Sequence, residues 1–266
     1  MKNIQEIKTE FEQTGLLDMT ASALMDKAQK DILMAGLMER YASDGRAGVR
    51  GLFEKVRKTE AKAQKELERL EAMSAYEHQY AHLTYVCGID EAGRGPLAGP
   101  VVAGAVILPK DVKILYLNDS KKLTPQRREA LYEEIQEKAV SAQVGIIDCA
   151  RIDEINILQA TYEAMREAVS KLGVTPQMLL NDAVTIPEIS IPQTPIIKGD
   201  ALSVSIAAAS IMAKVTRDRM MDGYDILYPE YGFAKNKGYG TKEHIEAIRK
   251  YGPSPIHRRS FLTHFI

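Results

Sequence analysis

The chain has little of what marks a secreted, membrane-spanning or zinc-binding protein. Its 266 residues include only two cysteines, Cys87 and Cys149, which lie in apolar stretches without metal-ligand spacing. We expect both to be small core residues in a reducing cytoplasm. No stretch reaches the roughly 18 uninterrupted apolar residues that a membrane helix requires. The first residues are charged and do not form the apolar segment of a secretion signal, so a cytoplasmic protein with no membrane partner is expected.

The sequence also lacks a net charge that would indicate a polyanionic partner. Its formal net charge is −1. Basic residues are nevertheless concentrated in residues 235–259, where seven lysines and arginines accompany only two glutamates. Such a stretch can bind phosphates, although a solvated surface is the more common explanation when it is taken alone.

The first 80 residues differ in pattern from the rest. Apolar residues recur three or four positions apart, which predicts a short helix around Ile4–Phe11, a second over 20–41 and a third over 49–80. The third has a charged opposite face, typical of an exposed helix. We therefore expect residues 1–80 to form a solvated helical extension without a catalytic function, and residues 81–266 to form a second domain.

The second domain is predicted to be α/β, with a mixed sheet flanked by helices and further helices at its C-terminal end. Its first two strands are joined by too little chain for a crossover helix, so they should pair antiparallel. Strands are expected at 84–90, 100–108, 143–149, 178–183 and 194–198, and helices at 125–140, 152–172, 202–227 and 241–251.

Four acidic residues stand at the ends of predicted strands. Asp90 and Glu91 end the first, and Asp182 and Asp200 end two later ones. Strand ends at one edge of a sheet converge, and converging carboxylates repel one another unless cations hold them. Oxygen ligands select Mg²⁺ or Mn²⁺, and no His/Cys cluster suggests zinc. A turn-capping function is an equally good explanation for any single aspartate, but not for the set of four.

Two features adjoin the first pair of acids. Neighbouring strand residues point to opposite faces, so Asp90 is the better bridging ligand, and Glu91 is expected to act from the rim or through its carbonyl. Gly93-Arg94-Gly95 follows at once. Its glycines permit close backbone approach, and its arginine offers a donor fork for phosphate. A hairpin with a surface ion pair is the simpler alternative.

Several segments together resemble ribonuclease HII. They occur in the order of that family and span about residues 84 to 261. The N-terminal extension lies outside this shared body and is similar to extensions on some bacterial members. The matching segments are GIDEAGRGPLAGPVVAGAVIL (88–108), NDSKKL (118–123), the strand ending in Asp182, KGDALSVSIAAASIMAKVTRDR (198–219), KGYGTKEH (237–244) and PIHRRSF (255–261).

The resemblance implies a ribonuclease H-like fold and hydrolysis of RNA paired with DNA, including single ribonucleotides embedded in duplex DNA. It implies that Asp90, Glu91, Asp182 and Asp200 bind the catalytic metals. It further implies that Gly93-Arg94-Gly95 recognises the ribose 2′-OH and that Tyr239 senses the substrate. Lys121, Ser210 and Lys214 are additional substrate-binding candidates. For Ser210, close helix packing is an equally good explanation, and His257 is expected to be structural or phosphate-facing.

The expected chemistry is metal-dependent hydrolysis, because nothing in the sequence suggests a covalent nucleophile. Two metals about 4 Å apart can activate a water and neutralise the leaving 3′-oxygen. Cleavage should therefore leave 5′-phosphate and 3′-hydroxyl ends. The 2′-OH is the chemical mark that separates RNA from DNA, and a glycine-rich backbone can supply donors and acceptors to read it.

Departures from the family pattern are mild, and rival interpretations remain open. Asn181 stands where the family usually has an apolar residue, and Asn236 where a histidine often stands. Ribonuclease HIII is a poorer match, since its motif at the Gly-Arg-Gly turn differs and its extension is strand-rich.

The rival functions are those of a non-catalytic hybrid-binding protein and of another metal nuclease acting on DNA. Nothing demands more than a monomer.

Overall fold

The computed structural model of the chain describes residues 2–263 and divides into two compact units, Met1–Ala72 and Met73–Ile266. The division falls before the expected limit at residue 80, because a short helix, α5 (Ala75–Gln79), packs with the second unit. The Tyr80 hydroxyl, for example, lies 2.8 Å from Thr194 Oγ1. The domain limits given above stay a prediction.

The first unit is a small helical bundle of α1 (Ile4–Gln13), α2 (Met19–Leu24), α3 (Lys27–Tyr41) and most of α4 (Ala47–Met73). Its core contains Phe11, packed edge-on against Phe53 with ring centroids 5.0 Å apart. The single helix expected over 20–41 is wrong, since Asp26 caps a new helix with its side chain. The single helix over 49–80 is likewise interrupted, between α4 and α5.

The second unit contains a five-stranded mixed sheet in the order β3-β2-β1-β4-β5. The strands are β1 (Val86–Ala92), β2 (Val101–Ile107), β3 (Ser141–Ile147), β4 (Met178–Asp182) and β5 (Gln193–Ile196). The predicted antiparallel pairing of the first two strands is confirmed. β4 pairs parallel with β1, and β5 pairs parallel with β4. Asp90 and Glu91 both lie within β1, which runs two residues beyond the expected end at residue 90.

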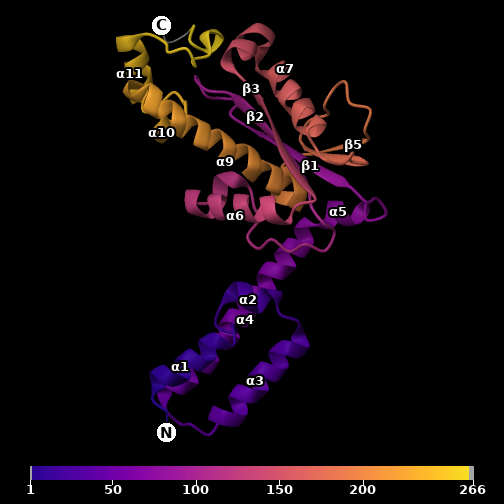
Figure 1. Cartoon of the computed structure of the whole chain (residues 1–266), viewed down its shortest axis with the longest axis vertical. Coiled ribbons are helices and arrows are strands. Elements are labelled where there is room, and N and C mark those ends of the chain that lie inside the picture. Colours follow the sequence, from indigo (N-terminus) through magenta and orange to yellow (C-terminus); the bar gives the residue numbers. More distant parts are fainter. Residues whose placement is uncertain (1, 264–266) are drawn as a thin grey trace. The chain divides into compact units, whose positions relative to one another are not determined.

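Helices cover both faces of this sheet (Figure 1). On one face α7 (Cys149–Ser170) packs against β2 and β3, and on the other α9 (Val204–Leu227) packs against β1 and β2. Residues Cys87 and Ile89 of β1 belong to the core shared with α7, so the alternate residues Gly88 and Asp90 face α9. The remaining helices are α6 (Pro125–Lys138), α8 (Gly199–Leu202), α10 (Phe233–Asn236) and α11 (Lys242–Tyr251).

Helix starts account for most differences from the predicted boundaries. The Asp148 side chain caps α7, which therefore begins at Cys149 and not near residue 152. Ser203 caps α9, which therefore begins at Val204 and matches the helix expected over 202–227 to within two residues, while the short helix α8 before it was not expected. Asp200 consequently lies in the first turn of α8 and not at the end of a strand. Within residues 2–263 we find no helix with the length and hydrophobicity of a membrane span.

Candidate active site

Three of the predicted acids meet at one edge of the sheet. Parallel pairing of Ile89 with Asn181 sets Asp90 of β1 beside Asp182 at the end of β4. Asp182 accepts a 2.8 Å hydrogen bond from the amide of Gly199, which ties the start of α8, and with it Asp200, to β4. Carboxylate oxygens of Asp90, Asp182 and Asp200 all lie within 4.8 Å of one another. The structure thus gathers three oxygen ligands from three different elements.

Glu91 stands apart from these three acids. Its carboxylate lies 3.3 Å from the Arg94 guanidinium, and the side chain is largely buried. Burial raises the pKa of Glu91, while the charge of Arg94 opposes the rise. Asp182 raises this pKa further, so Glu91 is close enough to sense the cluster. This arrangement agrees with a rim position and with opposite side-chain directions for Asp90 and Glu91.

The cluster is electrostatically unfavourable on its own. Burial raises the pKa of Asp90 well above its ordinary value, and the charges of Glu91 and Asp182 add to the effect. Burial is also the first cause of the raised pKa of Asp200, followed by repulsion from Asp119 and Asp182. A divalent cation would remove these penalties by neutralising the carboxylates. Because the donors are all carboxylate oxygens, they fit Mg²⁺ or Mn²⁺.

Lys121 and Ser210 border the acids. Burial alone would lower the pKa of Lys121, but the charges of Asp90 and other nearby carboxylates outweigh it and raise this pKa. Lys121 therefore stays protonated beside the cluster. Ser210 is buried, its Oγ lies 2.9 Å from Ser120 Oγ, and its hydroxyl partly offsets the raised pKa of Asp90. This geometry favours a supporting contact to Asp90, while direct substrate contact by Ser210 stays a prediction.

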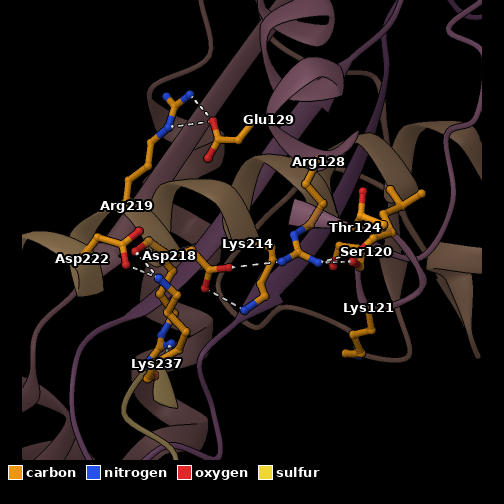
Figure 2. A network of polar contacts seen from close by, with 12 residues as sticks. Ser120, Lys121, Thr124, Arg128, Glu129, Lys214, Asp218, Arg219, Asp222 and Lys237 are labelled. Atoms are coloured by element: carbon orange, nitrogen blue, oxygen red, sulfur yellow. Dashed lines mark hydrogen bonds and ion pairs between the residues drawn. The ribbon is translucent and has the colours of Figure 1, made fainter. Parts of the chain in front are cut away.

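A row of charges along α9 links the surrounding loops (Figure 2). Lys214 Nζ donates to Asp218 Oδ1 over 2.6 Å, and burial lowers the pKa of Lys214. Arg128 lies 3.6 Å from the other oxygen of Asp218 and donates to the carbonyl of Ser120. One turn further along α9, Asp222 pairs with Lys237. Lys214 is thus part of a network that fixes the turn around Ser120 and the loop around Lys237.

The Gly-Arg-Gly turn is held from inside by two buried arginines. Arg258 donates to the carbonyl oxygens of Gly93 (2.5 Å) and Arg94 (2.9 Å). Gly93 has φ +93°, and a Cβ there would lie 2.1 Å from Arg217 Nε, so only glycine fits. Within residues 2–263, the amides of Arg94 and Gly95 donate no hydrogen bond. These amides are therefore available to a ligand.

Tyr239 lies against this turn. A Cβ built on Gly95 would be 3.8 Å from the ring carbon Cε1 of Tyr239, and the residue is 48% exposed. The residue lies in a loop between α10 and α11, which argues against simple helix packing. Gly238 has φ +84°, and a Cβ there would lie 2.3 Å from the carbonyl oxygen of Ala98, so the loop approaches that backbone closely.

The two departures from the family pattern have structural explanations. Asn236 accepts a hydrogen bond from the amide of Gly238 and donates to the carbonyl of Tyr231, so it closes the tyrosine loop. Asn181 is fully buried and donates to Gln193, which in turn bonds the main chain of Ile186. Its side chain points away from the acids and anchors the loop after β4.

Sequence reasoning missed the buried arginines Arg217 and Arg258. Both lie in segments that had been singled out, but a basic side chain beside other charged residues suggests a solvated position. Most of their carbonyl acceptors come from residues more than a hundred positions away, such as Pro100 for Arg217, and the nearest, Lys237, is 20 positions away, so no local signal exists. His257, by contrast, is 3% exposed, which makes the structural alternative correct and the phosphate-facing one wrong.

Comparison with known proteins gives a consistent result. The family model of ribonuclease HII matches residues 87–264, and that of the ribonuclease HII N-terminal domain matches residues 24–81. Ribonuclease HII of Lachnoclostridium phytofermentans is 61% identical over 227 residues, which are 85% of this chain and 89% of the relative. Ribonuclease HII of Clostridioides difficile is 55% identical over 246 residues, which are 89% of this chain and 96% of the relative.

Among solved structures, the ribonuclease H2 of Pyrococcus horikoshii matches with a TM-score of 0.55 and 31% identity. The match covers 66% of this chain and 93% of the archaeal chain. The predicted ribonuclease H-like fold, a mixed sheet flanked by helices, is confirmed by this similarity together with the observed sheet.

Proposed function

This chain belongs to the ribonuclease HII family of metal-dependent nucleases, and we propose that it cleaves the RNA strand of RNA/DNA hybrids and cuts on the 5′ side of ribonucleotides embedded in duplex DNA. The single observation that carries the proposal is the juxtaposition of a carboxylate cluster with the Gly-Arg-Gly turn. β1 connects them directly, since Asp90 lies inside it and Gly93 follows it.

Asp90, Asp182 and Asp200 would hold the metal, with Glu91 joining from the rim. When bound, divalent cations supply Lewis-acid stabilisation of the attacking water and of the leaving 3′-oxygen, in an in-line displacement that leaves 5′-phosphate and 3′-hydroxyl ends. Asp90 is suited to the bridging position because it is buried and hydrogen-bonded by the amide of Glu91 at 2.7 Å, which fixes its orientation. The donor set fits either Mn²⁺ or Mg²⁺.

The free amides of Arg94 and Gly95 supply the donors that a ribose 2′-OH requires. Tyr239 lies across from Gly95 and offers a flat, half-exposed ring on which a sugar can pack. The Arg94 side chain is exposed and can contact the strand backbone. Together these groups recognise the hydroxyl by contacts that deoxyribose does not make.

Positive charge around the cluster would place the scissile phosphate. Lys121 lies beside the acids and remains protonated. Lys214 lies on α9 one turn after Ser210, and its pairing with Asp218 sets its position. Both are point charges that suit a phosphate oxygen.

The proposal is tested with three duplexes of one sequence: all DNA, DNA with one ribonucleotide, and DNA with one 2′-O-methyl ribonucleotide. We expect metal-dependent cutting of the ribonucleotide duplex alone, because deoxyribose has no 2′-oxygen for the amides of the turn and the methyl group of the third duplex blocks their approach to it. Cutting of a long hybrid should occur as well. Equal cutting of all three duplexes would show a general nuclease, and binding without cutting by folded protein would show a hybrid-binding protein.

A further inference from the structure

The loop that carries Tyr239 and the Gly-Arg-Gly turn are fastened to one short segment near the C-terminal end. Leu97, just after the turn, donates its amide to the carbonyl of Gly238 over 2.8 Å. On its other side the carbonyl of Leu97 accepts from the amide of Arg258 at 2.9 Å, and Ala98 forms an antiparallel bridge with His257. Three segments distant in sequence therefore lie edge to edge.

Neighbouring side chains of that segment reach the two substrate-reading elements. Arg258 holds the carbonyls of Gly93 and Arg94, as described above. His257 reaches the tyrosine loop through a second histidine: His257 Nε2 lies 3.0 Å from His244 Nε2, and His244 Nδ1 lies 2.8 Å from the carbonyl oxygen of Tyr239.

The direction of this histidine relay is fixed at both ends. The amide of Ser254 lies 2.9 Å from His257 Nδ1, and an amide can only donate, so Nδ1 carries no proton. His257 therefore bears its proton on Nε2 and donates to His244 Nε2. His244 must then carry its proton on Nδ1, where it donates to the Tyr239 carbonyl, which can only accept. Both ends require the same pair of neutral tautomers.

The surroundings keep both rings neutral and in place. His244 and His257 are almost fully buried and pack against Tyr231 and Phe233, with ring centroids 4.9 Å apart for Tyr231 and His257 and 5.4 Å for Phe233 and His244. Burial lowers the pKa of His244, and that of His257 falls to about 4. At neutral pH the relay has its full set of hydrogen bonds, and a further proton on either ring would break one of them.

The relay ends on the residue whose side chain faces the turn. The carbonyl of Tyr239 accepts from His244 and also from the amide of Thr241 at 2.8 Å. With the carbonyl fixed, the Tyr239 ring is directed toward Gly95 on the other side of the chain. A rotation of this peptide would move the ring away from the turn.

We propose that His244 and His257 are positioning residues that hold Tyr239 at the correct separation from the Gly-Arg-Gly turn, and that this separation sets the selectivity of the enzyme for a 2′-OH. The inference rests on the proposed function and concerns the same site. Neither histidine touches the substrate, and both act through the Tyr239 backbone.

A double-mutant cycle between His244 and Tyr239 tests the proposal. His244→Gln keeps a polar group near the Nε2 position but removes the Nδ1 donor to Tyr239. We expect it to lower the single-turnover rate on a one-ribonucleotide duplex by about tenfold or more, with little change in duplex binding, since a small misplacement suffices for such a loss. In a Tyr239→Ala background the same change should have almost no further effect. Full additivity of the two losses would overturn the proposal.

His244→Asn is the matched control. Its amide nitrogen can occupy the Nδ1 position and donate to the Tyr239 carbonyl, while contact with His257 is lost. We expect this variant to recover most of the rate that His244→Gln loses. If both variants lose the rate equally, the Nδ1 donor is not what positions Tyr239, and the proposal fails.

A measurement on the unaltered chain covers the case in which these variants do not fold. Long-range ¹H–¹⁵N correlation spectra of ¹⁵N-histidine-labelled protein report the tautomer of each of the five histidines. We expect two rings that are neutral at pH 7.5, one with its proton on Nε2 and one with its proton on Nδ1. The absence of a neutral Nδ1–H ring would overturn the relay.

Failure of this inference is distinguishable from failure of the proposed function. If the unaltered enzyme does not cut the one-ribonucleotide duplex, the proposed function is wrong. If it cuts and the cycle is additive, the function stands and the histidines are ordinary packing residues.

Discussion

Acidification should weaken the fold through His257. The ring is 3% exposed, and burial, together with the neighbouring His244, lowers its pKa from the ordinary value of 6.5 to about 4. The unfolded chain therefore binds more protons than the folded chain between these values. Stability must fall as the pH drops below about 6.5, and the loss must level off below about 4.

The size of the effect follows from these two values. At pH 5 the protonated form of the His257 imidazole outnumbers the neutral form by about thirty to one in the unfolded chain, whereas the folded ring stays mostly neutral. His257 therefore lowers the free energy of unfolding by about 2 kcal/mol relative to neutral pH. His244 adds a contribution of the same sign, because burial also lowers its pKa. Such a loss is a large part of the stability of an ordinary domain.

The assay compares the wild type with His257→Asn in urea unfolding, followed by circular dichroism in EDTA at several pH values from 7.5 to 5. Carboxylates with raised pKa values, such as Asp90 and Asp200, change stability in the opposite direction, but they do so in both proteins and cancel in the difference. We expect the stability advantage of the wild type to shrink by about 2 kcal/mol over this range. A difference that stays constant with pH would refute a buried, neutral His257.

Three further predictions concern the site and its supports. Asp182→Asn should abolish metal-dependent cleavage without loss of stability in EDTA, since it removes one of three mutually repelling carboxylates; normal turnover by the folded variant in saturating Mg²⁺ would contradict this. Tyr239→Ala should reduce single-ribonucleotide cleavage more than hybrid binding, measured by single-turnover rates and by anisotropy, whereas equal losses would make it a packing residue. Glu77→Ala should lower the free energy of unfolding in urea by about 1–2 kcal/mol, because Glu77 accepts hydrogen bonds from Ser203 Oγ (2.6 Å) and the Ser205 amide (3.0 Å) at the start of α9. Glu77→Gln keeps an acceptor, so its free energy of unfolding should fall less.

Much of the fold could be predicted because the strands are local apolar runs. The stretch before Asp90 and the run from Val101 are such runs, and the short connection between them requires antiparallel pairing. Helix interruptions were missed where a capping side chain outweighs an otherwise continuous helical pattern. Asp26 acts in this way, and it begins a new helix that periodicity alone cannot separate from the one before it.

The site was predictable to the extent that residue type carries the chemistry. Carboxylates placed near strand ends indicated a metal site, and Asp90, Asp182 and Asp200 do converge. Their supports were not predictable, because they depend on contacts between segments far apart in the chain. The Arg258 contact to Gly93 and the His257 contact to His244 exist only once the sheet and α11 are in place.

The helical extension shows the same limit. Its helical character was predictable from apolar spacing, but the breaks between its helices and the contacts of α5 were not. Glu77 caps α9, and Tyr80 contacts Thr194, so a truncation meant to remove only the extension should retain residues 73–80. Removal of residues 1–80 would also remove this cap, so a loss of stability could not be distinguished from a loss of function of the extension.

Cleavage of an end-labelled DNA duplex with a single ribonucleotide tests the central claim most directly. The reaction is run in Mg²⁺, in Mn²⁺ and in EDTA, beside the same duplex without the ribonucleotide. We predict a metal-dependent cut on the 5′ side of the ribonucleotide, with 3′-hydroxyl and 5′-phosphate ends, and no cut in the all-DNA duplex. Cutting in EDTA, or equal cutting of both duplexes by folded protein, would contradict a metal-dependent site that reads the 2′-OH.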